Sequence, residues 1–118
     1  MTGQEFLVPG DAEILEAFGV ESEATDGVES TRSLRLAAGV GDEVCLTYDI
    51  PGRSIHLQWF RKGVCVLDIF REEAVRMSVN SSEGVTTLSL TFESGSLSGE
   101  LHVQVWPTLS VNDRLLAH

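Results

Sequence analysis

Apolar and polar residues alternate along most of the chain from residue 31 onward. Alternation predicts β-strands, because successive side chains of a strand point to opposite faces of a sheet. The alternating runs fall at residues 34–36, 44–48, 55–59, 75–79, 88–92 and 101–105. A further run at 63–70, GVCVLDIF, is apolar on both faces, which is typical of a central strand.

Turn-forming residues separate these runs at short intervals, at 39–41, 51–52, 62–63, 80–84 and 94–99. No segment of helical length interrupts them, which disfavours strands linked by crossover helices. Residues 31–111 are therefore expected to form a mainly-β, antiparallel meander, sandwich or open barrel of about seven strands. We expect its core to contain Trp59 together with Leu46, Leu57, Leu90, Val103 and Val105.

One short helix is predicted at residues 10–19. Asp11 is a favourable N-cap, Ile14, Leu15 and Phe18 share one face, and Gly19 supplies a C-terminal stop. A helix of this length is not stable alone, so its apolar face is expected to dock on the β body. Residues 21–30 are polar, acidic and unpatterned, and predict a linker within one domain spanning 1–118.

The net charge of −10 is concentrated at the N-terminus. Residues 1–30 hold eight acids and no Lys or Arg, whereas the remaining residues hold ten acids and eight bases. This balance disfavours nucleic-acid binding, which needs concentrated positive charge. It allows a basic protein partner, and Glu21, Glu23, Asp26 and Glu29 form a candidate acidic contact segment.

Cysteine content and hydropathy point to a cytoplasmic protein. No apolar run approaches the length of a membrane span, and the N-terminus lacks the pattern of a secretory signal. Cys45 and Cys65 are accordingly expected to be unbridged thiols in a reducing compartment. They lie in no metal-binding motif, so neither a metal site nor a cofactor is expected.

Two segments of the sequence resemble each other. The run 54–60, SIHLQWF, and the run 100–106, ELHVQVW, each place apolar residues on one face and His, Gln and an aromatic on the other. If both strands belong to one sheet, these side chains form a single candidate binding patch, made of His56, Gln58, Phe60, His102, Gln104 and Trp106. The alternative interpretation is the ordinary solvated face of a half-buried sheet.

Part of the chain resembles an immunoglobulin-type sandwich. Residues 41–48 and 55–63 are similar to strands B and C of that family, and 88–90 and 98–103 to strands E and F. The resemblance implies that Trp59 is the core tryptophan. The chain departs from the family at the disulfide positions, which hold Tyr48 and Val103, and at Leu101, where that family has a tyrosine.

These observations favour binding over catalysis, because no catalytic motif is present and pairs such as Glu72-Glu73 are expected to form a solvated turn. The leading hypothesis is a non-catalytic module that binds a protein partner. Bacterial immunity proteins, which neutralise a toxin by covering it, share its small size and acidity. The alternatives are an immunoglobulin-like scaffolding domain and a small-molecule binder that uses a barrel interior or a sheet face.

Overall fold

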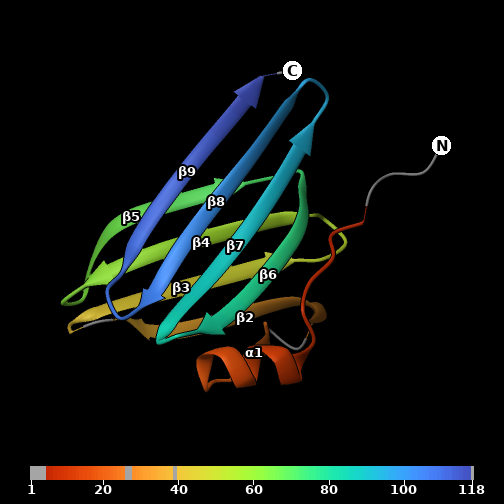
Figure 1. Ribbon diagram of the computed structural model, residues 1–118. Coiled ribbons are helices and arrows are strands. Elements are labelled where there is room, and N and C mark those ends of the chain that lie inside the picture. Colours follow the sequence, from red (N-terminus) through yellow and green to blue (C-terminus); the bar gives the residue numbers. More distant parts are fainter. Residues whose placement is uncertain (1–4, 26–27, 39, 118) are drawn as a thin grey trace.

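Two antiparallel sheets, each made of consecutive strands, form most of the computed structural model, which describes residues 5–25, 28–38 and 40–117 (Figure 1). The first sheet contains β1 (Glu23–Thr25), β2 (Val28–Ala38), β3 (Asp42–Asp49), β4 (Ser54–Arg61) and β5 (Val64–Arg71), in that order. The second contains β6 (Ala74–Ser82), β7 (Val85–Ser94), β8 (Leu97–Trp106) and β9 (Ser110–Ala117), also in order. The mainly-β prediction with one short helix is confirmed, and the sheets pack as a sandwich.

The structure contains two strands where alternation was weak. Residues 21–30 were expected to be a linker, but β1 lies within them and pairs with the beginning of β2. The β body was expected to end at residue 111, but β9 continues to Ala117. Both β1 and β9 lie at sheet edges, where only one neighbour constrains the strand, and burial therefore imposes less of a period-two pattern.

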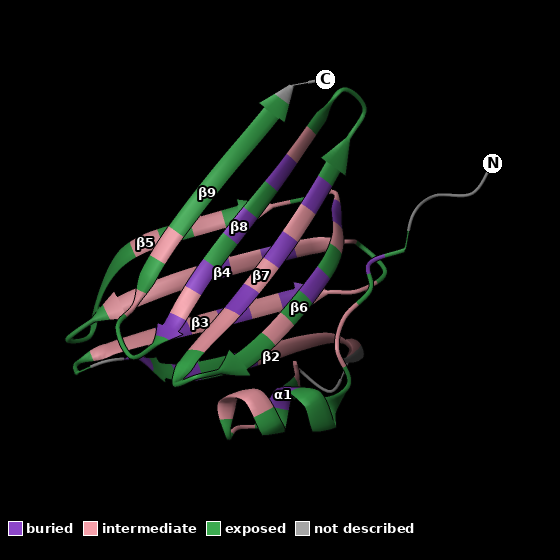
Figure 2. Ribbon diagram, viewed as in Figure 1, coloured by how far each residue is buried: buried purple, intermediate pink, exposed green. Residues whose placement is uncertain are grey.

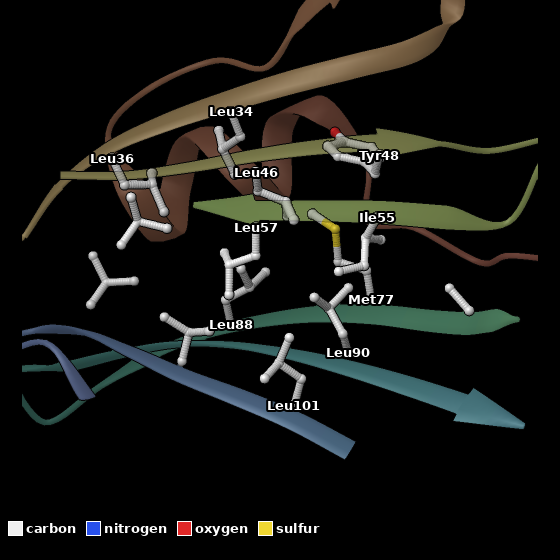
Figure 3. Close-up of a cluster of buried hydrophobic side chains, with 14 of the residues drawn as sticks. Leu34, Leu36, Leu46, Tyr48, Ile55, Leu57, Met77, Leu88, Leu90 and Leu101 are labelled. Carbon is white, nitrogen blue, oxygen red and sulfur yellow. The ribbon is translucent and has the colours of Figure 1, made fainter. Parts of the chain in front are cut away.

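The core lies between the two sheets and is filled by aliphatic side chains from both (Figure 3). Leu46 and Leu57 of the first sheet and Leu88 and Leu101 of the second are at most 1% exposed. Each fully buried leucine of this kind contributes about 1.5–3 kcal/mol relative to an exposed one. The predicted core positions Leu46, Leu57, Leu90, Val103 and Val105 are all buried.

Trp59 differs from the expectation, because it is half-buried and lies outside the buried core cluster. Its indole Nε1–H donates to the Asp42 carboxylate at 3.0 Å, and the Arg61 guanidinium lies 5.0 Å from the ring centroid. The Arg61 Nε also donates to Asp42 at 3.0 Å. The hydrogen bond from Trp59, followed by the one from Arg61, lowers the pKa of Asp42. An aromatic ring with a polar handle is stable at the rim of a core, where the N–H can reach a partner.

The chain crosses from one sheet to the other only once among the named strands, at Glu72 and Glu73. Glu73 has a left-handed backbone (φ 67°), its carboxylate accepts from Arg53 at 3.0 Å, and the Ala74 N–H donates to the Arg53 carbonyl. The predicted turn at Glu72-Glu73 is therefore the link between the sheets. The immunoglobulin comparison fails here, because that family places strands B and C in different sheets, whereas β3 and β4 are neighbours in one.

The helix α1 (Asp11–Phe18) packs against β6, with Ile14 fully buried and Leu15 exposed. Its N-cap is Gly10 rather than the predicted Asp11, whose carboxylate instead accepts from Ser22 and Arg32. Gly19 ends the helix in the left-handed conformation (φ 74°), as expected. No helix in the described part of the chain has the length and hydropathy needed to span a membrane.

The run GVCVLDIF was expected to be a central strand, and this prediction is wrong. It forms β5, which is the last strand of its sheet and pairs with β4 alone among the named strands. Its inward residues Leu67 and Ile69 are half-buried, whereas Val66 and Phe70 are exposed. Apolar residues on both faces therefore did not indicate, in this case, that the strand has a neighbour on each side within its sheet.

Burial predicts different costs for the two neighbours Leu57 and Trp59. Leu57→Ala leaves a cavity in the core and should lower the free energy of unfolding by about 2–5 kcal/mol. Trp59→Phe removes one hydrogen bond at the rim and should lower it by about 1 kcal/mol. Urea denaturation of both variants measures the order, and a larger loss for Trp59→Phe would contradict this placement of the core.

Candidate functional site

The six residues of the predicted binding patch do not form one surface. His56, Gln58 and Phe60 lie on β4 in the five-stranded sheet, whereas His102, Gln104 and Trp106 lie on β8 in the four-stranded sheet. His56 and Gln58 on β4 and the three residues on β8 alternate with inward positions, and Phe60 lines a surface hollow with Arg35 and Cys45, so each group faces outward from its own sheet. The prediction of one patch is therefore wrong, and the sandwich separates its halves onto opposite faces.

On the outer face of the first sheet, His56 and Gln58 converge on a carboxylate of β5. The His56 Nε2 lies 2.6 Å from Asp68 Oδ1, and the Gln58 amide donates to Asp68 Oδ2 at 3.3 Å. The ring of Phe70 meets the His56 ring edge-on, with 6.3 Å between centroids. This cluster holds Asp68 in one orientation at the side of the sheet, next to an exposed aromatic ring.

On the outer face of the second sheet, His102 is held by its own set of partners. Its Nδ1 lies 3.0 Å from the Ser89 hydroxyl and its Nε2 lies 3.3 Å from Glu100 Oε2. The Gln104 amide donates to the Thr108 carbonyl at 2.9 Å. Trp106 is 53% exposed, as a surface role requires, and lies near the end of α1.

These two clusters do not bring the histidines together at one site. Each imidazole is engaged with a carboxylate of its own face, and the two imidazoles lie on opposite faces of the sandwich. Among the described residues, no three His, Cys, Asp or Glu side chains gather as metal ligands. Each face does present hydrogen-bonding groups beside an exposed aromatic side chain, Phe70 on one face and Trp106 on the other. Such a combination is typical of protein interfaces.

The acidic candidate segment lies partly within the described residues. Glu21 and Glu23 are exposed, and the helix adds the exposed Glu13 and Glu16. Asp26 and the side chain of Glu29 lie outside the described residues. This N-terminal region is tied to the sheet through Arg32, which donates to the hydroxyl and carbonyl of the buried Ser22.

Val40, in the turn before β3, is fully exposed, and the next most exposed large apolar residues lie on the edge strands β5 and β9, which sequence reasoning did not select. Figure 2 shows the exposed positions along both strands. Val64, Val66 and Phe70 of β5 are 50–65% exposed, and Leu115 and Leu116 of β9 are 60% and 62% exposed. Exposed apolar residues along a sheet edge are typical of a site where another chain can pair. The run GVCVLDIF, apolar on both faces, was the sequence signal for this surface. It indicated a buried central strand until the structure placed the strand at a sheet edge.

An ion pair joins these two edge strands. The Arg71 guanidinium at the end of β5 donates two parallel hydrogen bonds of 2.7 Å to the carboxylate of Asp113 on β9. Arg71 also covers the ring of Phe92, 5.2 Å from its centroid. Beside this pair lies an apolar groove of about 210 Å³, whose lining includes Leu97 and Leu115.

Both cysteines are free, and β4 separates the strands that carry them. Cys45 on β3 is half-buried, and this burial raises the pKa of its thiol. Cys65 on β5 is exposed at the sheet edge.

Comparison with known proteins identifies a structural likeness at low sequence identity. One chain of a solved structure, described as a contact-dependent growth inhibition toxin–immunity protein complex from Klebsiella pneumoniae 342, matches with a TM-score of 0.81 and 12% identity. The match covers 93% of this chain and 96% of that one. No family model and no curated protein matches the sequence. At this identity the likeness shows a shared fold.

The ion pair between β5 and β9 predicts a pH-dependent contribution to stability. Hydrogen bonds from Arg71 lower the pKa of Asp113, so the stabilisation is present above the unfolded-state pKa near 4 and is lost as pH falls through the folded-state value. Because the pair is partly exposed, Asp113→Asn should lower the free energy of unfolding by about 0.5–1 kcal/mol at neutral pH.

The measurement is urea denaturation of parent and variant across acidic and neutral pH. The exposed Glu93, for which the described residues show no ion pair, provides the control Glu93→Gln, expected within about 0.5 kcal/mol of the parent. A gap between parent and Asp113→Asn that is as large near pH 2 as at neutral pH would show that the ion pair is not its origin.

The two thiols should differ in reactivity. Cys65 is exposed, whereas Cys45 is half-buried and has a raised pKa, so iodoacetamide should modify Cys65 faster, on the order of tenfold. Mass spectrometry of the folded protein over time, with Cys45→Ser and Cys65→Ser to assign the sites, measures both rates. Equal rates would contradict the placement of Cys65 on an open edge.

Proposed function

We propose that this chain is an immunity-type protein that binds a protein toxin and neutralises it by covering it. The observation that carries the proposal is the fold likeness to a chain of a toxin–immunity protein complex, which extends over nearly all of both chains. The likeness alone establishes the fold, so the remaining support comes from the surface of this chain.

The chemistry of the surface supports the neutralising role rather than the toxic one. The two histidines lie on opposite faces of the sandwich, so they cannot act together as general acid and base on one substrate. Several guanidinium groups are also held by carboxylates, as in the pairs of Arg53 with Glu73 and Arg71 with Asp113. Such pairing leaves little uncompensated positive charge for a nucleic acid substrate.

The exposed acidic side chains suggest the charge of the partner. Glu13, Glu16, Glu21 and Glu23 are exposed at the N-terminal side of the sandwich, and the net charge is −10. We therefore propose a basic toxin, because opposite charge accelerates association while apolar contacts govern the lifetime of the complex. The free thiols of Cys45 and Cys65 fit a reducing cytoplasm, where we propose the protein acts.

A growth assay with the native partner tests the proposed function. The tagged chain is purified from its native host, and each protein recovered in stoichiometric amount is expressed alone in a naive strain. We expect one of them to arrest growth, and co-expression of this chain to restore it. The control is Leu57→Ala, whose core cavity should reduce the folded population and weaken the protection. A partner that never arrests growth, or an arrest that this chain does not relieve, would refute the proposed function.

A further inference from the structure

Sheet edges in natural proteins are usually protected against pairing with other chains. The two sheets have four edge strands, and three of them show such protection. β1 has only three residues. β6 is covered by the N-terminal segment, since the Met77 N–H donates to the Leu7 carbonyl at 2.8 Å and the Leu7 N–H to the Val75 carbonyl at 3.1 Å. β9 carries the adjacent charges Asp113 and Arg114.

The fourth edge, β5, is neither short nor covered by another segment of the described chain, and its charges, Asp68 and Arg71, are not adjacent. One bulge interrupts its pairing with β4, between Trp59 and Phe60. The strand β5 has eight residues, Val64–Arg71, and contains neither lysine nor proline. Within the described part of the chain it pairs with β4 and with no other named strand. Its outward side chains Val66 and Phe70 are 50% and 65% exposed, with Asp68 between them. A long apolar edge of this kind is a template for an added strand.

The facing sheet provides an independent sign that a strand is missing beside β5. Leu97 precedes the buried Gly99 and Leu101 at period two, and Leu115 lies opposite Gly99 on β9, so both leucines belong to the inner face. They are nevertheless 42% and 60% exposed. In Figure 1 the ends of β7, β8 and β9 extend beyond β5, and the apolar groove of about 210 Å³ lies in this corner. The first sheet is thus too narrow to cover the inner face of the second.

We propose that the toxin partner donates an extended strand that pairs with β5 and fills this groove. The strand continues the first sheet, its inner side chains cover Leu97 and Leu115, and its outer side chains flank Val66 and Phe70. This inference rests on the proposed function for the identity of the donor. It differs from the predicted His/Gln/aromatic patch in placing the contact along the edge of β5 rather than across a sheet face.

The charge of β5 and of the whole chain indicates which kind of strand can pair with β5. Asp68 is the acidic residue of β5, its side chain is 53% exposed, and His56 and Gln58 contact its carboxylate. A Lys or Arg on the incoming strand opposite Asp68 forms a favourable cross-strand pair. A second copy of this chain brings the same net charge of −10, which opposes self-association. The occupant is therefore an apolar strand with a basic residue on its outer face.

The pairing can be tested without the toxin, using a capped synthetic decapeptide. The peptide alternates Val for the inner face with Thr for the outer face, and carries one central Lys among the threonines. Amide hydrogen exchange by NMR and alkylation of Cys65 report on the β5 edge. We expect the peptide to slow exchange along β5 but not along β1, and to protect Cys65. A peptide with Glu in place of Lys, and one with proline at two central valines, should do neither.

Two variants of the protein and one matched control locate the contact. Asp68→Lys reverses the charge opposite the peptide lysine and should weaken binding by about tenfold, and Leu115→Thr should also weaken it. Glu93→Lys makes the same charge change on the other sheet and should bind as the parent does. Absence of slowed exchange at β5 with about 1 mM peptide, or equal binding by Asp68→Lys, overturns the proposal. A parent dimer that Asp68→Lys dissociates overturns it in favour of a second copy.

The same variants separate this inference from the proposed function in the growth assay. Loss of protection with Asp68→Lys, but not with Glu93→Lys, supports both. Full protection by both variants leaves the neutralising function in place and overturns the β5 contact. Peptide binding to β5 by a chain that relieves no toxicity supports the strand site and refutes its assignment to a toxin.

Discussion

Packing of two apolar sheet faces against each other is the constraint on which the structure depends. Leu46 and Leu57 from one sheet and Leu88 and Leu101 from the other are buried only because the sheets meet, and either sheet alone would expose its row to water. This packing also sets the register, since a slip of one residue would turn every buried side chain outward. Once the inner faces are fixed, the remaining side chains of each strand point to solvent. These include His56, Asp68, His102 and Trp106.

Alternation predicted the strands well where one face is buried and the other is not. β3, β4, β7 and β8 lie inside the sheets, and their buried positions match the alternating residues. It failed at the edge strands β1 and β9. Residues 23–25 and 112–117 form strands with little alternation, because backbone pairing with one neighbour suffices there. The same reasoning misplaced Trp59, because strand periodicity assigns a face but does not say how near a residue lies to the rim of the core.

The candidate site shows a second limit of sequence reasoning. The similarity between 54–60 and 100–106 was real, and each segment does present His, Gln and an aromatic outward. Periodicity could not say which sheet each strand joins, because that depends on where the chain crosses, at Glu72 and Glu73. The exposed apolar edge was hidden for a related reason. Residues 63–70 are apolar on both faces, and this pattern is the same for an exposed edge strand as for a strand with neighbours on both sides.

The single crossing between the sheets bears on how the chain acquires its structure. Every ladder between named strands joins neighbours in sequence, so each half of the sandwich is built from hairpins, and contacts distant in sequence form mainly when the halves dock. Pairing of sequence neighbours gives a lower contact order than the interleaved connections of Greek-key sandwiches, which shortens the search for the native topology relative to those folds. For a protein whose proposed task is to intercept a poison, rapid folding shortens the interval after synthesis in which the cell is unprotected.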